Sequence, residues 1–175
     1  MKSSAAIRTL VFVADPPIFA RRGPRPHIPE VLPHVQMDQW PPAGIAGRLL
    51  ARASRLPYVE IRQSRMASDA TSALCLVDEG AGGPVEAFID GHEFCHVLPL
   101  PEGTIHLTLP PAEKTFAIAC GWAEEHPVAR TGIVSNSLVT LYAPRDEDEL
   151  AVALHLIESS WQFARGYPDG EALDD

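Results

Sequence analysis

The chain has 175 residues, 46% of them hydrophobic, and a net charge of −9 with a pI near 5.2. Its length predicts one domain with a hydrophobic core, and its acidity argues against a nucleic acid or an anionic membrane as a partner. The three cysteines show no C-x-x-C spacing, which predicts neither a disulfide framework nor a zinc knuckle and favours a reduced, cytoplasmic setting.

The N-terminal third is rich in proline. Residues 7–13 are a brief apolar run interrupted by Arg8, too short to span a membrane, and they predict a strand or a short helix. Residues 15–42 contain many prolines, so we expect an extended arm that wraps the body. Whether this arm covers a pocket or only packs on the body stays open. Its expected apolar anchors are Ile18, Phe19, Val31, Leu32 and Trp40.

The rest of the chain alternates between helix and strand patterns. Apolar residues at helical spacing predict helices at 43–56, 112–120 and 147–165, the last with Asp146 as its N-cap and Gly166 as its end. Strands are predicted at 58–62, 72–77, 85–89, 92–97, 104–109 and 137–142, with a hairpin turn at residues 90–91.

These elements predict an α+β fold, in which an antiparallel sheet of about five strands is packed by two or three helices. Within one domain of residues 1–175, we expect residues 1–57 to be the arm plus a helix and residues 58–166 the core. Residues 167–175 read as a solvated acidic tail. The sequence leaves the oligomeric state open, a homodimer included.

Three of the seven histidines, His96, His106 and His126, lie at the edges of predicted elements beside apolar residues. Imidazole is the side chain whose ordinary pKa lies near neutrality, so several in one pocket would supply general acid–base chemistry. The alternative is that each is a satisfied polar residue in a small fold. His106 alternates with Ile105 and Leu107, so on a strand it points away from both.

A metal site is a further possibility that the spacing disfavours. His92, His96 and His106 could form a three-histidine site. However, the turn at residues 90–91 favours strand geometry, which separates His92 and His96 by about 13 Å. We therefore predict no metal at this site.

Four motifs in one order resemble the fungal luciferase family and its bacterial relatives. They are EFCH at residues 93–96, TIHLTL at 104–109, GWAEEHP at 121–127 and LYAPRDEDE at 141–149. The resemblance covers roughly residues 72–166, with a fainter correspondence at residues 33–36. Leu98 stands where the family commonly has the second histidine of an H-x-H pattern.

The resemblance implies a small oxygenase that uses neither a metal nor an organic cofactor, with molecular oxygen as its co-substrate. The fungal enzyme adds O₂ to a hydroxylated pyrone of polyketide type, so secondary-metabolite chemistry on a small molecule is the expected function. A cyclase, an isomerase or a decarboxylase could use the same histidines, and a non-catalytic ligand-binding domain could keep the fold alone.

Cofactor-free oxygenation requires deprotonation of the substrate, stabilisation of its anion and exclusion of water. We expect His96, His106 and His126 to supply the first two. Glu93 either orients a histidine or is an exposed strand residue. The expected substrate-binding residues, of which Arg145 could equally be a structural salt-bridge partner, are Phe94, Leu98, Trp122, Tyr142 and Arg145.

Overall fold

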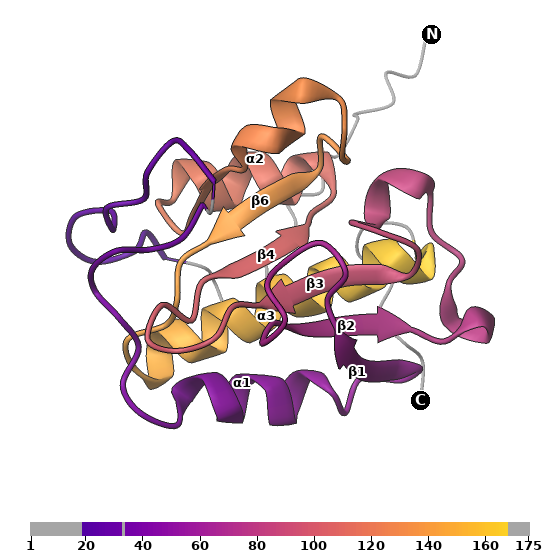
Figure 1. Ribbon diagram of the computed structural model, residues 1–175, viewed down its shortest axis with the longest axis horizontal. Helices are drawn as coiled ribbons and strands as arrows, with labels where there is room; N and C mark the ends of the chain where they lie inside the picture. Colours follow the sequence, from indigo (N-terminus) through magenta and orange to yellow (C-terminus); the bar gives the residue numbers. More distant parts are fainter. Residues whose placement is uncertain (1–18, 33, 168–175) are drawn as a thin grey trace, which may run out of the picture.

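The computed structural model describes residues 19–32 and 34–167. The apolar run at residues 7–13 and the acidic tail beyond residue 167 lie outside the described residues. Figure 1 shows one twisted sheet with helices behind it and beside it, and residues 19–42 as an arm at the left of the view.

The sheet of the described chain has six strands in the order β1-β2-β3-β4-β6-β5, and each neighbouring pair is antiparallel. The central strands β3, β4 and β6 are buried along their whole length. The predicted α+β fold is confirmed, with a strand count close to the expected five. The strands are β1 (Val59–Gln63), β2 (Ser72–Leu76), β3 (Glu93–Val97), β4 (Ile105–Thr108), β5 (Ala123–Glu125) and β6 (Leu138–Leu141).

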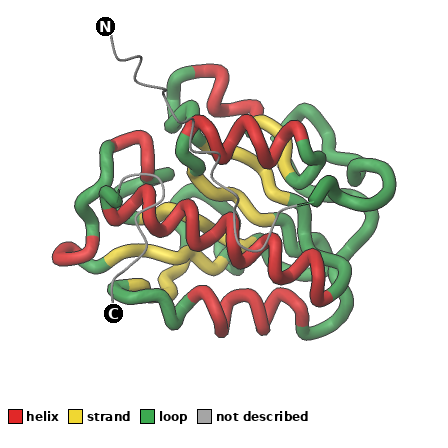
Figure 2. Tube along the Cα trace, turned by 180° about the vertical axis from the view of Figure 1, so that it is seen from behind, coloured by secondary structure: helices red, strands yellow, loops and turns green. Residues whose placement is uncertain are grey.

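Helices α1 (Ile45–Ala53) and α3 (Glu147–Arg165) pack against each other, and α3 also crosses the back of β3 and β4 (Figure 2). Helix α2 (Pro111–Ala119) packs beside the edge strand β5. The core between α3 and the sheet includes the fully buried Leu150, Ile157 and Trp161. Each such side chain contributes roughly 2 kcal/mol through burial. The three predicted helices are therefore present, although α1 is shorter than expected.

The start of α3 is fixed by the residues that the sequence singled out. Asp146 Oδ1 accepts a hydrogen bond from the Glu149 N–H (2.9 Å), as predicted for an N-cap. The Glu149 carboxylate does not close a capping box onto Asp146. It accepts instead from the Arg145 N–H (2.9 Å) and pairs with the Arg145 guanidinium. Gly166, with a φ of 81°, ends the helix.

Two segments differ from the prediction. Residues 85–89 were expected to form a hairpin with β3, but they turn through the short 3₁₀ helix η2 (Val85–Ala87), followed by a single bridge from Asp90 to Glu93. Both edges of β3 are occupied by β2 and β4, so no edge remains for that hairpin. Conversely, the expected loop after Trp122 contains β5, whose three residues are too few for periodicity to reveal.

The arm is held by polar contacts rather than by its apolar side chains. Four expected anchors (Phe19, Val31, Leu32 and Trp40) are 51–73% exposed, so that prediction is wrong for them, and Ile18 lies outside the described residues. Gln36 is fully buried instead. Its Oε1 accepts from the Ala143 N–H (3.0 Å), its Nε2 donates to the Gln39 carbonyl (2.7 Å), and its own N–H donates to Thr104 Oγ1 (3.0 Å).

Across residues 19–32 and 34–167, we find no helix with both the length and the apolar character needed to cross a bilayer.

Candidate active site

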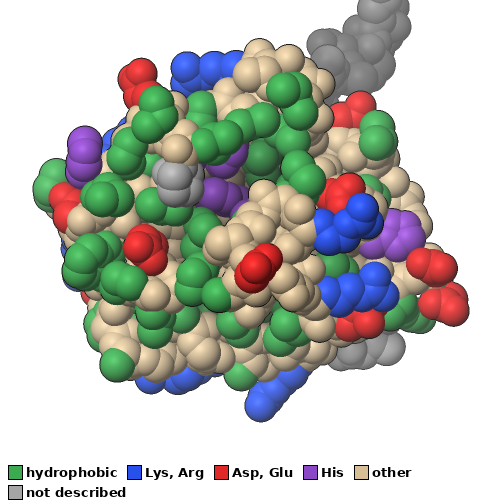
Figure 3. Space-filling model, in the orientation of Figure 1, with side chains coloured by type: hydrophobic (Ala, Val, Ile, Leu, Met, Phe, Trp, Pro, Cys, Tyr) green, Lys and Arg blue, Asp and Glu red, His purple; other side chains and the backbone are tan. Residues whose placement is uncertain are grey.

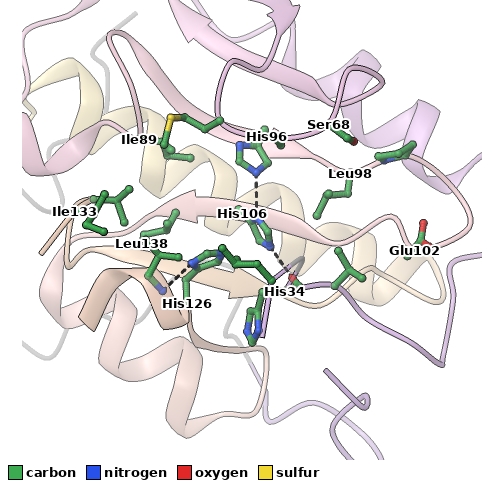
Figure 4. A pocket seen from close by; sticks show the side chains of 17 residues that line it. His34, Ser68, Ile89, His96, Leu98, Glu102, His106, His126, Ile133 and Leu138 are labelled. Atoms are coloured by element: carbon green, nitrogen blue, oxygen red, sulfur yellow. Dashed lines mark hydrogen bonds between the residues drawn. The ribbon is translucent and has the colours of Figure 1, made fainter. Parts of the chain in front are cut away.

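A cavity of about 680 Å³ lies on the face of the sheet opposite α3 (Figures 3 and 4). The arm, the loop at residues 66–68, strands β3 and β4 and the segment 126–138 contribute to its wall. Most of the wall is aliphatic, and none of the side chains that line it within residues 19–32 and 34–167 is a lysine or an arginine. The polar lining residues are His34, Ser68, His96, Glu102, His106 and His126.

Polar residues form one row across the strands beneath this cavity. In the strand register His96 lies opposite His106, His106 opposite Thr140, and Thr140 opposite Glu124. Directly opposed residues of antiparallel strands point to the same face. The neighbours of His106 along β4, Ile105 and Leu107, belong to the hydrophobic core as predicted. Alternation along the strands thus places the polar row on the cavity face and the apolar residues in the core.

Glu93 reaches the same face as His96 because β3 contains a bulge. Residues three apart on a regular strand point to opposite faces. The pairing of β2 with β3 shifts between Leu74 and Cys75, and Phe94 is the extra residue. Such an insertion changes the direction of the side chains next to it. The Glu93 carboxylate therefore lies 2.6 Å from His96 Nδ1.

The bulge is supported from both faces of the sheet. On the cavity side, Ser64 Oγ donates to Glu93 Oε1 (3.0 Å), and Glu93 is only 4% exposed. On the core side, the Ser160 hydroxyl of α3 donates to the Phe94 carbonyl (3.2 Å). Glu93 is consequently a buried partner of His96, and the alternative of an exposed strand residue is wrong.

Glu93, His96 and His106 form a hydrogen-bonded string whose protons can be assigned. The His34 carbonyl can only accept, so His106, 3.0 Å away, donates from Nε2. Burial lowers the pKa of His106 well below its ordinary value, so its Nδ1 carries no proton and accepts from His96 Nε2 (2.9 Å). One further proton is then shared between His96 Nδ1 and Glu93 Oε1. The string thus carries one proton more than two neutral histidines and a carboxylate would hold. Figure 4 shows its links from His96 to His106 and from His106 to the His34 carbonyl.

His126 stands beside this string without joining it. Its ring centroid is 4.6 Å from that of His106, and its Nδ1 accepts from the Val128 N–H (3.4 Å). Burial lowers the pKa of His126 to about 4, and the nearby His34 and His96 add to this effect. The ring is therefore neutral near pH 7, with its proton on Nε2. Within the described residues Nε2 has no hydrogen-bond partner, which leaves it available as a donor to the cavity.

Two residues of the site were missed by the sequence reasoning. His34, from the arm, lies with its ring centroid 5.3 Å from that of His126, and its Nε2 is 2.9 Å from Glu124 Oε1. Only the faint correspondence at residues 33–36 indicated His34. Glu124 would have been found if residues 123–125 had been recognised as a strand, since alternation places it on the face of His126.

The expected substrate-binding residues divide into two groups. Leu98 lines the cavity, where its apolar side chain follows His96 by one strand repeat. The other four do not line it. Phe94 belongs to the core behind the sheet, and Trp122 donates to the Phe19 carbonyl (2.6 Å). Tyr142 donates to Glu124 (2.9 Å), and Arg145 pairs with Glu149.

The described residues contain no group of three or more His, Cys, Asp or Glu side chains arranged to hold a metal ion. His92, considered above as a partner of His96, lies apart from the cavity lining and pairs instead with Asp78 (3.4 Å). The cavity histidines direct most of their ring nitrogens to hydrogen-bond partners. That a metal and a cofactor are not needed stays a prediction from the resemblance.

Fold and site together define a small α+β domain in which a buried carboxylate–histidine string faces an apolar cavity. Residues 91–160 match the family model described as "Luciferase domain". The chain is 27% identical, over 90% of its length, to a protein named luciferase from Armillaria ostoyae, and 26% identical over the same share to one from Armillaria mellea. A luciferase from Neonothopanus nambi is 29% identical over 47% of this chain and 32% of the relative.

The resemblance to the fungal luciferase family predicted from the sequence is thus confirmed. The chain spans about 65% of the length of the Armillaria proteins. No solved structure matches the chain significantly.

Proposed function

We propose that this protein is a small enzyme that performs histidine-based acid–base chemistry on an enolisable or phenolic small molecule. Oxygenation of a polyketide or pyrone-type compound, without a metal or an organic cofactor, is the proposed reaction. The observation that carries the proposal is the buried string from Glu93 through His96 to His106 at the wall of a 680 Å³ cavity. Similarity to proteins named luciferase supports the choice of oxygenation.

The first step would be removal of a substrate proton. Both ring nitrogens of His96 face partners in the free protein, and catalytic hydrogen bonds often rearrange when a substrate binds. Once the string has released its extra proton to solvent, the proton left on His96 lies on Nδ1 against the Glu93 carboxylate, and Nε2 is bare. A substrate hydroxyl that takes the place of His106 beside His96 Nε2 would then meet an imidazole backed by the Glu93 carboxylate. That arrangement is a general base, because the carboxylate stabilises the imidazolium that forms.

The second step would be the reaction of the anion with O₂. His126 Nε2–H would donate a hydrogen bond to the anion, and the aliphatic wall would exclude water. The anion passes one electron to O₂, and the two radicals combine to form a carbon–oxygen bond. The peroxide then takes back the proton held by His96, so that substrate and O₂ together give a hydroperoxide with all atoms retained.

The test is oxygen uptake by chelator-treated protein with a panel of hydroxypyrones and phenolic enols. We expect uptake by the natural sequence and a loss of roughly 10²-fold or more in His96→Gln and in His126→Ala, since each removes a group that acts on the proton or the anion. His92→Ala is the matched control, because His92 is outside the cavity lining, and it should retain full activity.

Other results would contradict the proposal in different ways. Substrate consumption without oxygen uptake, still dependent on His96, would identify a cyclase, an isomerase or a decarboxylase. Tight binding of a panel compound with no turnover would favour a ligand-binding domain. Oxygen uptake that is unaffected by His96→Gln would show that the Glu93–His96–His106 string takes no part in the reaction.

A further inference from the structure

Besides Glu93 and His96, a second carboxylate–histidine pair lies next to the cavity. It consists of His34 from the arm and Glu124 from β5. His34 is 4% exposed, with Nδ1 2.8 Å from the Pro29 carbonyl oxygen and Nε2 2.9 Å from Glu124 Oε1. The second contact has the distance of an ion pair, although its angle is too bent for a regular hydrogen bond. Both partners are acceptors, so the ring satisfies them only with a proton on each nitrogen.

Glu124 is held in its charged form by contacts at both oxygens. The Tyr142 hydroxyl donates to Oε2 (2.9 Å), while Oε1 faces His34. Burial alone would raise the pKa of Glu124, but the interactions with His34 and Tyr142 outweigh it and lower the pKa. Arg25 of the arm acts in the same direction. A charged carboxylate at 2.9 Å favours the imidazolium form of His34.

The His34–Glu124 pair differs from the other polar groups at the cavity in the partners of its histidine ring. Among the described residues the lining contains no lysine or arginine, and its one carboxylate is Glu102. His34 is the lining residue whose two nitrogens both face oxygen acceptors, and its ring stands edge-on to that of His126. His106 also lies close to His126, but its Nε2 donates its proton to the His34 carbonyl oxygen.

We propose that His34 is a positioning residue that carries a positive charge, held by Glu124, and that this charge acts beside burial to disfavour protonation of His126, whose Nε2–H faces the cavity. The positive charge would also balance an anion formed in the cavity, and this last step rests on the proposed function. The arm would then be part of the active site: its main chain accepts the proton of His106, and its His34 side chain places a positive charge beside His126.

The test is NMR of the ring nitrogens in ¹⁵N-histidine-labelled protein without substrate, so its outcome is independent of turnover. At pH 7 we expect His34 to carry protons on both nitrogens. Glu124→Gln should remove one of them. In His34→Gln the pKa of His126 should rise by about half a pH unit or more, because a neighbouring positive charge is lost.

Glu125→Gln is the matched control, since Glu125 pairs instead with Lys114 and Arg130 on the adjacent position of β5. It should leave both histidines unchanged. One bare nitrogen on His34 in the natural sequence at pH 7 would overturn the proposal, as would an unmoved His126 in folded His34→Gln. If His34→Gln does not fold, Glu124→Gln still decides whether the carboxylate holds the second proton.

Discussion

His96, His106 and His126 carry their protons in three different patterns because their ring nitrogens face different atoms. His106 donates to a carbonyl and so presents a bare Nδ1 to His96. His96 shares a proton with Glu93, whereas His126 accepts from a main-chain N–H and keeps its proton on the cavity side. The role of each ring therefore follows from its neighbours, which residue type alone does not reveal.

The lowered pKa of His126 predicts how stability depends on pH. An unfolded histidine takes up its proton near pH 6.5, whereas folded His126 does so at about 4. Between these values the unfolded state binds more protons, so the free energy of unfolding falls as the pH falls. We expect the urea midpoint to decrease from pH 7 to pH 4.5 and to decrease less in His126→Gln. The buried His106 contributes in the same direction.

Exposed His27 provides the control, since His27→Gln should leave the pH dependence as it is. An equal decrease in the natural sequence and in His126→Gln would show that His126 is not protonated more readily in the unfolded chain.

At the level of single elements, the N-cap of α3 can be tested against a neighbour of the same charge. Asp146→Ala removes the acceptor for the Glu149 N–H and should lower the free energy of unfolding by about 1 kcal/mol. Asp148 lies in the same first turn, with an 85% exposed side chain that makes only a surface contact with Arg22. Asp148→Ala should cost much less, and urea denaturation of both variants measures the difference. Equal losses would mean that charge near the helix dipole matters and the cap does not.

The sequence revealed the elements whose causes are local. Caps, prolines and apolar stripes lie within each helix, so α2 and α3 were predicted nearly in full. The wrong hairpin at residues 85–89 and the missed β5 both depend on which strand edges are free, and that is decided by distant parts of the chain.

The residues of the site also divide into those that local sequence predicted and those that depend on the rest of the fold. His96, His106 and His126 were predicted and do meet at one cavity. Glu93 could not be assigned because strand alternation places it on the wrong face unless the bulge is known. Trp122 and Tyr142 were proposed as wall residues, yet their hydrogen bonds direct them to the arm and to Glu124. A motif indicates which residues gather, but not which way each side chain points.

For the molecule as a whole, the arm acts as a wall of the site and is locked by a few buried polar groups. Gln36→Ala would leave the Ala143 N–H and the Gln39 carbonyl without their partner. An unsatisfied buried group costs roughly 1–3 kcal/mol, so we expect the arm to detach more often. Limited proteolysis should cut residues 19–42 faster in this variant, and any turnover should fall with it.

Gln63→Ala is the control for this experiment, because Gln63 is exposed and makes only a long contact with Asp69 (3.5 Å). If proteolysis of the arm is the same in Gln36→Ala as in Gln63→Ala, other contacts hold the arm.

The serine behind the bulge makes the site depend on more than the strands that carry its residues. Ser160 donates to the Phe94 carbonyl from a helix 66 residues further along the chain. A graft of the two histidine-bearing strands onto a foreign sheet would carry every residue of the string. It would lose the Ser160 hydroxyl and keep only the longer contact of Thr108 Oγ1 with that carbonyl (3.4 Å). Without the bulge, regular alternation would turn Glu93 away from His96. The support of the string thus extends from the sheet to the helix behind it.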